Sequence, residues 1–193
     1  MSTITAFEHI TLDGVMQGPG RADEDTRAGF THGGWANGYQ DDISMKYAGE
    51  GMRATRGLLF GRRSYEDVLG YWTSSGPNPF VDALVGSDKF VVSRGADTPL
   101  AYANSELLAG EAVTTVAALK DQYPHDLLIM GSGELVRSLH AAGLIDRYTL
   151  LIHPLVLGSG TRLFANGDRV DLKLERSLTT STGVVIAEFV AAL

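Results

Sequence analysis

Glycine, serine and arginine recur in this sequence at three points where a short apolar run ends. The three junctions are Gly61-Arg62-Arg63-Ser64, Ser93-Arg94 and Gly131-Ser132-Gly133. Glycine lets a ligand approach the backbone closely, and free N–H groups at the start of a helix favour anions. Arginine binds phosphate through a planar fork that lysine lacks. These residue types together predict a ligand that carries a pyrophosphate and one further phosphate group.

Each junction taken alone also has an ordinary structural interpretation. The glycine turn at 131–133 suits a plain tight turn, Arg62-Arg63 suits a solvated helix start, and Ser93-Arg94 suits a plain loop. The glycine turn is not the Rossmann dinucleotide fingerprint, because Val136 stands at its third glycine position. What favours phosphate binding is that the three junctions recur at one edge of the predicted sheet.

The runs before the junctions are predicted strands, and helices are predicted to follow two of them. The short apolar run Asp126–Met130 is typical of a strand that is covered on both faces. Glu134–Gly143 has apolar residues at helical spacing and a glycine stop. Strands that alternate with helices predict a mainly parallel sheet, whose carboxyl edge is where α/β folds bind ligands.

The rest of the chain extends this pattern. Further strands are predicted at Thr3–Leu12, Gly57–Phe60, Asp88–Val92 and Tyr148–His153, and helices at Asp41–Thr55, Arg62–Leu69, Pro77–Val85 and Val116–Tyr123. Leu172–Thr180 and Val184–Val190 flank a turn and predict a C-terminal hairpin. The polar stretch Gly14–Gly38 is long for a connection, so it is either a functional loop or partly disordered. We therefore expect a single α/β domain over residues 1–193: three layers, a mostly parallel sheet with helices on both faces, and an antiparallel hairpin.

Composition narrows the function classes. A net charge of −7 argues against broad nucleic-acid binding, which needs clustered lysine and arginine. The absence of cysteine removes disulfides, thiolate metal sites and cysteine nucleophiles. No stretch approaches the roughly 20 apolar residues of a membrane helix, and the N-terminus lacks the features of a signal peptide. A cytoplasmic protein without nucleic-acid or membrane partners is the expectation.

Other chemistry finds little support in the sequence. The five histidines show no metal-ligand spacing, so no metal site is expected, and neither a G-x-S-x-G elbow nor a P-loop occurs. His9 and His153 lie in apolar strands, where a hydrogen-bonded core histidine is the favoured interpretation. Four aromatic residues either line a slot for a flat ring or pack in the core: Trp35, Tyr39, Tyr71 and Trp72.

The order of these segments resembles the dihydrofolate reductase superfamily and, within it, the RibD C-terminal domain family of riboflavin-pathway reductases. The segments that carry the resemblance are Ile10–Gly14, Leu59–Glu66, Val91–Arg94, Ile129–Gly133, Asp146–Pro154 and Leu157–Phe164. The resemblance spans nearly the whole chain. It implies an NADPH-dependent reductase of a small heterocycle, similar to the 5-amino-6-(5-phosphoribosylamino)uracil reductase, and a homodimer. A dihydrofolate reductase-type activity and a non-catalytic binder of nucleotides or small rings remain open as alternatives.

The resemblance also implies roles for individual residues. Gly61, Arg62, Arg63 and Ser64 would meet the phosphates of the cofactor, and Ser93 and Arg94 its 2′-phosphate region. The turn and helix start would hold the pyrophosphate and the nicotinamide half, through Gly131, Ser132, Gly133, Glu134 and Leu135. Asp13 would be a catalytic residue or an anchor of the mobile loop Asp13–Gly20; a simple turn aspartate before Gly14 is the alternative.

Two departures from the family pattern bear on the function. Family turns often carry Gly-Gly joined by a cis peptide, whereas this chain has Gly131-Ser132. A cis bond without proline costs about 2.5–4 kcal/mol, so either the serine is held firmly or the bond is trans. Folate-reducing enzymes also place a carboxylate on the first helix, and that position falls near Met45 here, about one turn after Asp41 and Asp42. This displacement weakens the folate alternative.

Overall fold

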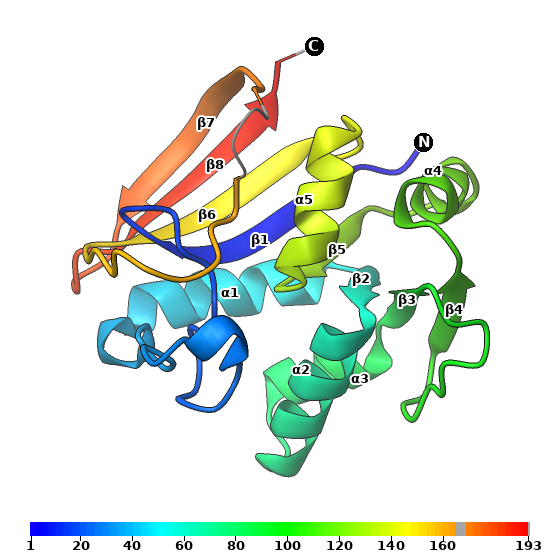
Figure 1. The fold of residues 1–193 in the computed structure, drawn as a ribbon, viewed down its shortest axis with the longest axis horizontal. Helices are drawn as coiled ribbons and strands as arrows, with labels where there is room; N and C mark the ends of the chain where they lie inside the picture. The colour runs from blue at the N-terminus through cyan, green and yellow to red at the C-terminus, as the bar shows by residue number, and fades with distance from the viewer. Residues whose placement is uncertain (165–168, 193) are drawn as a thin grey trace.

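A single sheet of eight strands forms the centre of the computed structural model, which describes residues 1–164 and 169–192. The strand order is β4-β3-β2-β5-β1-β6-β8-β7 (Figure 1). The strands are β1 (Ile4–Thr11), β2 (Gly57–Gly61), β3 (Asp88–Ser93), β4 (Ser105–Ala109), β5 (Leu127–Met130), β6 (Arg147–His153), β7 (Leu172–Thr179) and β8 (Val185–Ala191). The six strands from β4 to β6 are parallel, and β8 and β7 add the antiparallel hairpin. The predicted sheet and hairpin are confirmed.

Helices cover both faces of this sheet, which confirms the three layers. On one face lie α1 (Asp42–Ala54), α2 (Arg62–Ser74) and α3 (Pro79–Gly86), and on the other lie α4 (Ala112–Gln122) and α5 (Gly133–Ala141) (Figure 1). Val136 and Leu139 of α5 are fully buried against the α4–α5 face, as Tyr65 and Leu69 of α2 are on the other. None of the described helices has the length and apolar character that crossing a membrane requires.

The structure differs from the sequence-based expectation in three places. Strand β4 was not predicted, because its segment SELLA is an edge strand with only three consecutive apolar residues and no fully buried one. Helix α4 begins at Ala112 rather than Val116, since no side chain caps its first turn and the sequence gives no start signal. Helix α2 continues to Ser74, five residues past the predicted Leu69.

The long segment between β1 and α1 is an ordered loop. It contains two short 3₁₀ helices, η1 (Arg27–Gly29) and η2 (Asn37–Tyr39). Gln17, which is 5% exposed, organises the loop. Its side-chain amide donates to the backbone carbonyls of Asp25 and Arg27, and its backbone carbonyl accepts from Trp35 Nε1 at 2.7 Å. The sequence left Gly14–Gly38 as either a functional loop or a partly disordered segment, and the structure shows an ordered loop.

Candidate functional site

The three glycine, serine and arginine junctions come together at the carboxyl edge of the sheet. The Gly61 N–H at the end of β2 donates to Ser132 Oγ after β5, over 3.0 Å. A Cβ built on Gly131 would lie 3.9 Å from Ser64 Oγ. Ser93 is the last residue of β3, which pairs with β2 in parallel. The sequence-based expectation that these segments share one edge is therefore met by direct contacts.

The turn between β5 and α5 has an unusual backbone. Gly131 and Ser132 are both in the left-handed region, with φ values of 63° and 62°. A non-glycine residue there costs about 1–2 kcal/mol, and such strain is concentrated at functional sites. The Ser132 hydroxyl is held by the Gly61 N–H, and the Gly131-Ser132 peptide is trans. At the next residue, Gly133, a Cβ would lie 2.0 Å from Met16 Cε, so a side chain there would displace the thioether of Met16.

Helices that begin at this edge have no side-chain caps. Neither α2, with Gly61 as N-cap, nor α5, with Ser132 as N-cap, has a side-chain hydrogen bond to its first turn. By contrast, Asp41 caps α1 and Asn78 caps α3. The first N–H groups of α2 and α5 therefore retain their capacity to bind an anion, which the helix dipole also favours.

The arginines at this edge fall into two groups. Arg62 forms an ion pair with Glu66, at 3.0 Å between Nη1 and Oε1, on the surface of α2. Within the described residues, Arg63 and Arg94 have no acidic group within 4.0 Å, and both side chains are exposed. Ser93 Oγ accepts from the Gly95 N–H and shares a hydrogen bond with Thr98, so it shapes the turn that carries Arg94. Two guanidinium groups are thus available to a phosphate.

Two residues predicted to bind the cofactor point their side chains elsewhere. Glu134 Oε1 faces Arg27 Nη1 of the long loop at 3.2 Å. The side chain of Leu135 is buried in the core, with 6% exposure. Glu134 and Leu135 could therefore contact a ligand only through their backbone N–H groups at the start of α5.

The long loop spans the edge between α2 and α5. Arg27 contacts α5 through Glu134, and Arg21 contacts α2 through an ion pair with Asp67 and by lying 4.8 Å from the centre of the Tyr71 ring. Exposed ion pairs contribute little each, about 0–1 kcal/mol, so these contacts guide the loop without locking it. The loop forms one wall of the site.

Asp13 joins this loop to the segment after β6. Its carboxylate accepts hydrogen bonds from the Thr11 hydroxyl at 2.6 Å, from the Gly158 N–H at 2.9 Å and from the Leu157 N–H at 3.2 Å. The Thr11 hydroxyl and these backbone donors lower the pKa of Asp13, against a smaller opposing effect of burial. These contacts are those of a loop anchor, the second of the roles that the sequence left open.

We predict that Asp13→Ala lowers the free energy of unfolding by about 1 kcal/mol at pH 7, because the Thr11 hydroxyl, the half-buried Leu157 N–H and the exposed Gly158 N–H lose their acceptor and water replaces it only in part. A carboxyl whose pKa is lowered by folding stabilises the protein above its unfolded pKa of about 3.9 and loses that effect as the pH falls through the folded value. Urea unfolding at several pH values should therefore show the wild type and variant converging below about pH 4. A constant difference across that range would contradict the anchoring role of the carboxylate.

A histidine pair lies on the α1 face, near the carboxyl ends of β1 and β6, with His153 buried and His9 half-buried. His9 Nδ1 and His153 Nε2 are 3.0 Å apart, and the edges of the Trp35 and Tyr39 rings pack around His153. Burial lowers the pKa of each histidine to about 4, and for His9 the neighbouring His153 adds to the effect. The pair is thus neutral near pH 7, and the buried Nδ1 of His153 has no partner within the described residues. The sequence-based interpretation of hydrogen-bonded core histidines is confirmed.

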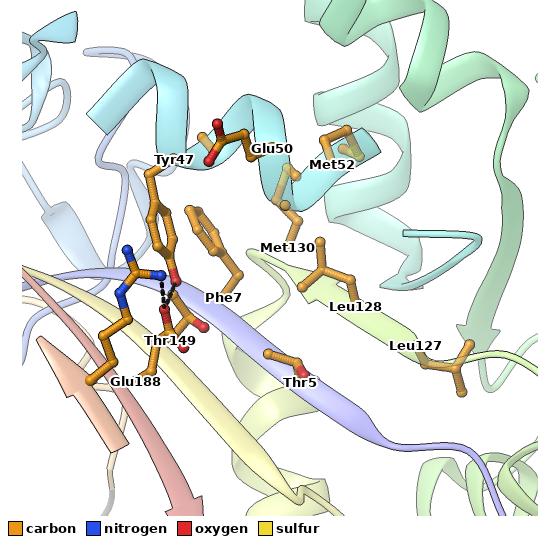
Figure 2. Close-up of a pocket in the computed structure, with 13 residues that line it drawn as sticks. Thr5, Phe7, Tyr47, Glu50, Met52, Leu127, Leu128, Met130, Thr149 and Glu188 are labelled. Carbon is orange, nitrogen blue, oxygen red and sulfur yellow. Dashed lines mark hydrogen bonds and ion pairs between the residues drawn. The ribbon is translucent and has the colours of Figure 1, made fainter. Parts of the chain in front are cut away.

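A cavity of about 310 Å³ separates α1 from the sheet beside this pair. Figure 2 shows Phe7, Leu128 and Met130 forming an apolar wall, with Tyr47 of α1 pointing toward Glu188. The cavity reaches the start of the turn, because Met130 lines it and immediately precedes Gly131. An apolar cavity with a few polar groups is the arrangement of a small-ligand pocket.

Comparison with known proteins assigns the chain. The family model described as the RibD C-terminal domain matches residues 2–186. The chain belongs to the RibD C-terminal domain family. "Uncharacterized protein YyaP" of Bacillus subtilis (strain 168) is 32% identical over 137 residues, which are 66% of this chain and 70% of that protein.

Solved structures show the same fold. A putative riboflavin biosynthesis protein from Shewanella sp. PV-4 has a TM-score of 0.72 at 20% identity, covering 99% of both chains. Dihydrofolate reductase from Enterococcus faecalis, solved as a complex with NADP(H), has a TM-score of 0.61 at 13% identity, covering 98% of this chain and 96% of that one. This member of the RibD C-terminal domain family therefore has a dihydrofolate reductase-like fold, as its sequence predicted.

One buried acidic residue was missed by the sequence reasoning. Glu8 of β1 is 5% exposed, and its Oε1 has no hydrogen-bond partner in the described part of the chain. Burial, with a smaller contribution from Glu24, raises the pKa of Glu8 well above its ordinary value. The signal was present in the strand, because Ile4, Ala6 and Ile10 alternate onto the α4–α5 face and place Glu8 on that face too.

The aromatic residues that could have formed one slot lie in two places. Trp35 and Tyr39 pack against the histidine pair, beside the cavity. Tyr71 and Trp72 pack on α2, where Trp72 contacts Phe80 of α3 with ring centres 4.7 Å apart. Trp35 and Tyr39 therefore lie beside the cavity, and Trp72 belongs to the α2–α3 packing. Tyr71 is exposed and contacts Arg21 of the long loop.

Proposed function

We propose that this protein is an NADPH-dependent reductase of a small heterocyclic substrate, of the type that reduces 5-amino-6-(5-phosphoribosylamino)uracil. The observation that carries the proposal is the meeting at one edge of two uncapped helix starts and two arginines that have no acidic partner among the described residues, next to an apolar cavity. A dinucleotide needs such donors for its phosphates, and a heterocycle needs such a cavity for its ring. Family membership and the likeness to an NADP(H)-bound dihydrofolate reductase support the same conclusion.

The residues at this edge fit the cofactor in charge and in donor chemistry. The backbone N–H groups that begin α2 and α5 would bind the pyrophosphate, together with Ser64 Oγ. Arg63 would bind the phosphates, and Arg94 the 2′-phosphate. NADPH supplies a hydride when bound.

The chain's own contribution is to position the rings and to exclude water. Met16 packs on Gly133, where its thioether covers the start of α5, and the loop from Gly14 to Gly38 closes the same side. The histidine pair, with Trp35 packed on His153, lies next to the cavity wall, because the ring centres of His9 and Phe7 are 5.9 Å apart. These groups make a partly dry chamber, in which electrostatic contacts with a substrate are stronger than in water.

The pyrimidine-type substrate is preferred over dihydrofolate for a structural reason. Met45 stands at the position where folate reductases carry a carboxylate, and its side chain is 57% exposed. Asp41 does not replace that carboxylate, because it caps α1 through Ser44 and accepts two hydrogen bonds from Ser181.

The proposal is tested by titrating the protein with NADPH and following the fluorescence of Trp35 and Trp72. Turnover is then measured as NADPH oxidation with 5-amino-6-(5-phosphoribosylamino)uracil and, separately, with dihydrofolate. We expect saturable NADPH binding and faster oxidation with the pyrimidine. Absence of NADPH binding at millimolar concentration would exclude the reductase, and binding without oxidation of any substrate would favour a non-catalytic binder.

A further inference from the structure

One row of side chains crosses five neighbouring strands beneath α1. In the sheet register, Met130 of β5 pairs with Phe7 of β1, and Phe7 pairs with Thr149 of β6. Thr149 pairs with Glu188 of β8, and Glu188 with Arg176 of β7. All five side chains line the cavity between α1 and the sheet, so they form one face, here called the five-strand row.

The row changes character from one end to the other. Met130 and Phe7 form its apolar end, one residue before the Gly131 turn (Figure 2). Glu188 and Arg176 form its charged end, with side chains 26% and 63% exposed. Helix α1 leaves room above the row because Ala48 and Gly51 face it with little side chain. The cavity of about 310 Å³ is within the range of small-ligand sites, roughly 300–1,000 Å³.

The polar groups at the charged end are only partly satisfied by each other. Tyr47 Oη donates to Glu188 Oε1 at 2.7 Å, and burial together with Glu188 raises the pKa of Tyr47 to about 12, so the phenol stays a donor. Arg176 Nη1 is 3.7 Å from the same oxygen, which is beyond hydrogen-bond distance. Among the described residues, neither Glu188 Oε2 nor the Arg176 guanidinium has another hydrogen-bond partner.

We propose that the five-strand row binds the substrate ring, and that Glu188 and Arg176 together recognise an edge with an N–H donor next to a carbonyl acceptor. Such an edge occurs in lactams and cyclic ureides. The carboxylate accepts from the N–H, and the guanidinium donates to the carbonyl. A lone carboxylate would select a cation and a lone arginine an anion, whereas this pair cancels in charge and selects a neutral ring.

The register also fixes how the ring lies. A flat ring over Phe7 and Thr149, with its polar edge toward Glu188, has its opposite side at Met130, next to the Gly131 turn. In a reductase, this side of the ring must face the cofactor. The catalytic role of this ring orientation therefore rests on the proposed function. Binding of the ring itself does not depend on NADPH and is tested separately.

Lumazine is a suitable probe because it is a flat bicyclic ring with N–H and carbonyl groups on one edge. 1,3-Dimethyllumazine is its matched control, since it has the same ring and carbonyls without those N–H donors. The chain's five methionines report the location of binding by methyl NMR. Met52 and Met130 line the cavity, Met16 contacts Gly133, and Met1 and Met45 are exposed.

We expect lumazine to shift the methyl signals of Met52 and Met130 and to leave Met1 unchanged, and dimethyllumazine to shift neither cavity methyl. Arg176→Met is expected to weaken lumazine binding about 10-fold, the upper range for one hydrogen bond to a neutral group. Glu188→Met should have at least the same effect. Arg147→Met is the control, because it removes an exposed arginine that pairs with Glu175 of β7 outside the cavity, at 2.7 Å.

The outcomes separate this inference from the proposed function. Lumazine binding that Arg176→Met does not weaken, equal binding of both lumazines, or no shift of Met52 and Met130 would overturn the inference, whatever NADPH does. Lumazine binding that depends on Arg176, together with no shift of Met16 by NADPH, would support the inference and overturn the reductase. Because Arg176 is exposed, its variant is expected to fold, and an unchanged melting temperature checks this.

Discussion

Replacing Arg94 with glutamine is expected to weaken NADPH binding about 10- to 100-fold while leaving NADH binding within about twofold. The two cofactors differ only in the 2′-phosphate, and Arg94 is the arginine that the proposal assigns to it. A charge-assisted hydrogen bond contributes about 1.5–3 kcal/mol, and each 1.4 kcal/mol is a factor of ten in affinity. Arg94 has no acidic partner within 4.0 Å in the described chain, so its charge is not already neutralised.

Arg63→Gln offers an internal contrast to this variant. Arg63 is expected to contact phosphates that both cofactors share, so its replacement should weaken NADPH and NADH to a similar extent. Arg53→Gln, at the exposed C-terminal turn of α1, should change neither affinity. Isothermal titration of both cofactors into the four proteins measures all of these differences. Equal losses of NADPH and NADH in Arg94→Gln would place the 2′-phosphate elsewhere.

The sequence was sufficient to predict that the three junctions share one edge of the sheet, for reasons that are local. Leu127–Met130 is buried as a parallel strand must be, and the glycine turn after it marks the carboxyl edge. Because parallel neighbours end at the same edge, Gly61, Ser93 and Gly131 could be placed together without knowing any contact. Strand β4 was missed because this edge strand is at most half-buried and its apolar run, Leu107–Ala109, is too short to stand out.

The sequence was not sufficient to predict which side chains face the ligand. Glu134 has the right position at the start of α5, but Arg27, 107 residues earlier, engages its carboxylate. His9 and His153 are 144 residues apart, and nothing in either strand indicates that they pair. The five-strand row likewise exists only through the register of four strand pairs. Contacts of this kind are set by tertiary packing, which a single sequence does not display.

The histidine pair is expected to make the protein acid-sensitive. Burial lowers the pKa of His153 to about 4, below the unfolded value of about 6.5, so the unfolded chain binds the proton first. Stability from the neutral histidine is therefore complete above about pH 6.5 and is lost as the pH falls toward 4. At about 1.4 kcal/mol per pH unit, His153 alone accounts for about 3 kcal/mol over this range, and His9 shares the effect because the two titrate as a coupled pair.

We therefore predict that His153→Phe removes about half or more of the loss of unfolding free energy between pH 6.5 and pH 4. The phenyl ring keeps the contacts with Trp35 and Tyr39 while removing the group that must stay unprotonated. Glu8 has the opposite linkage, because its raised pKa favours the folded state as the pH falls, but it is present in both proteins and cancels in their difference. His125→Phe, at an exposed position, is the matched control and should retain the wild-type slope. Urea unfolding at half-unit pH steps gives the free energy of unfolding of the three proteins as a function of pH. Parallel curves for wild type and His153→Phe would mean that the imidazoles are hydrated in solution. The partly dry chamber described for the proposed reductase would then lose its main support.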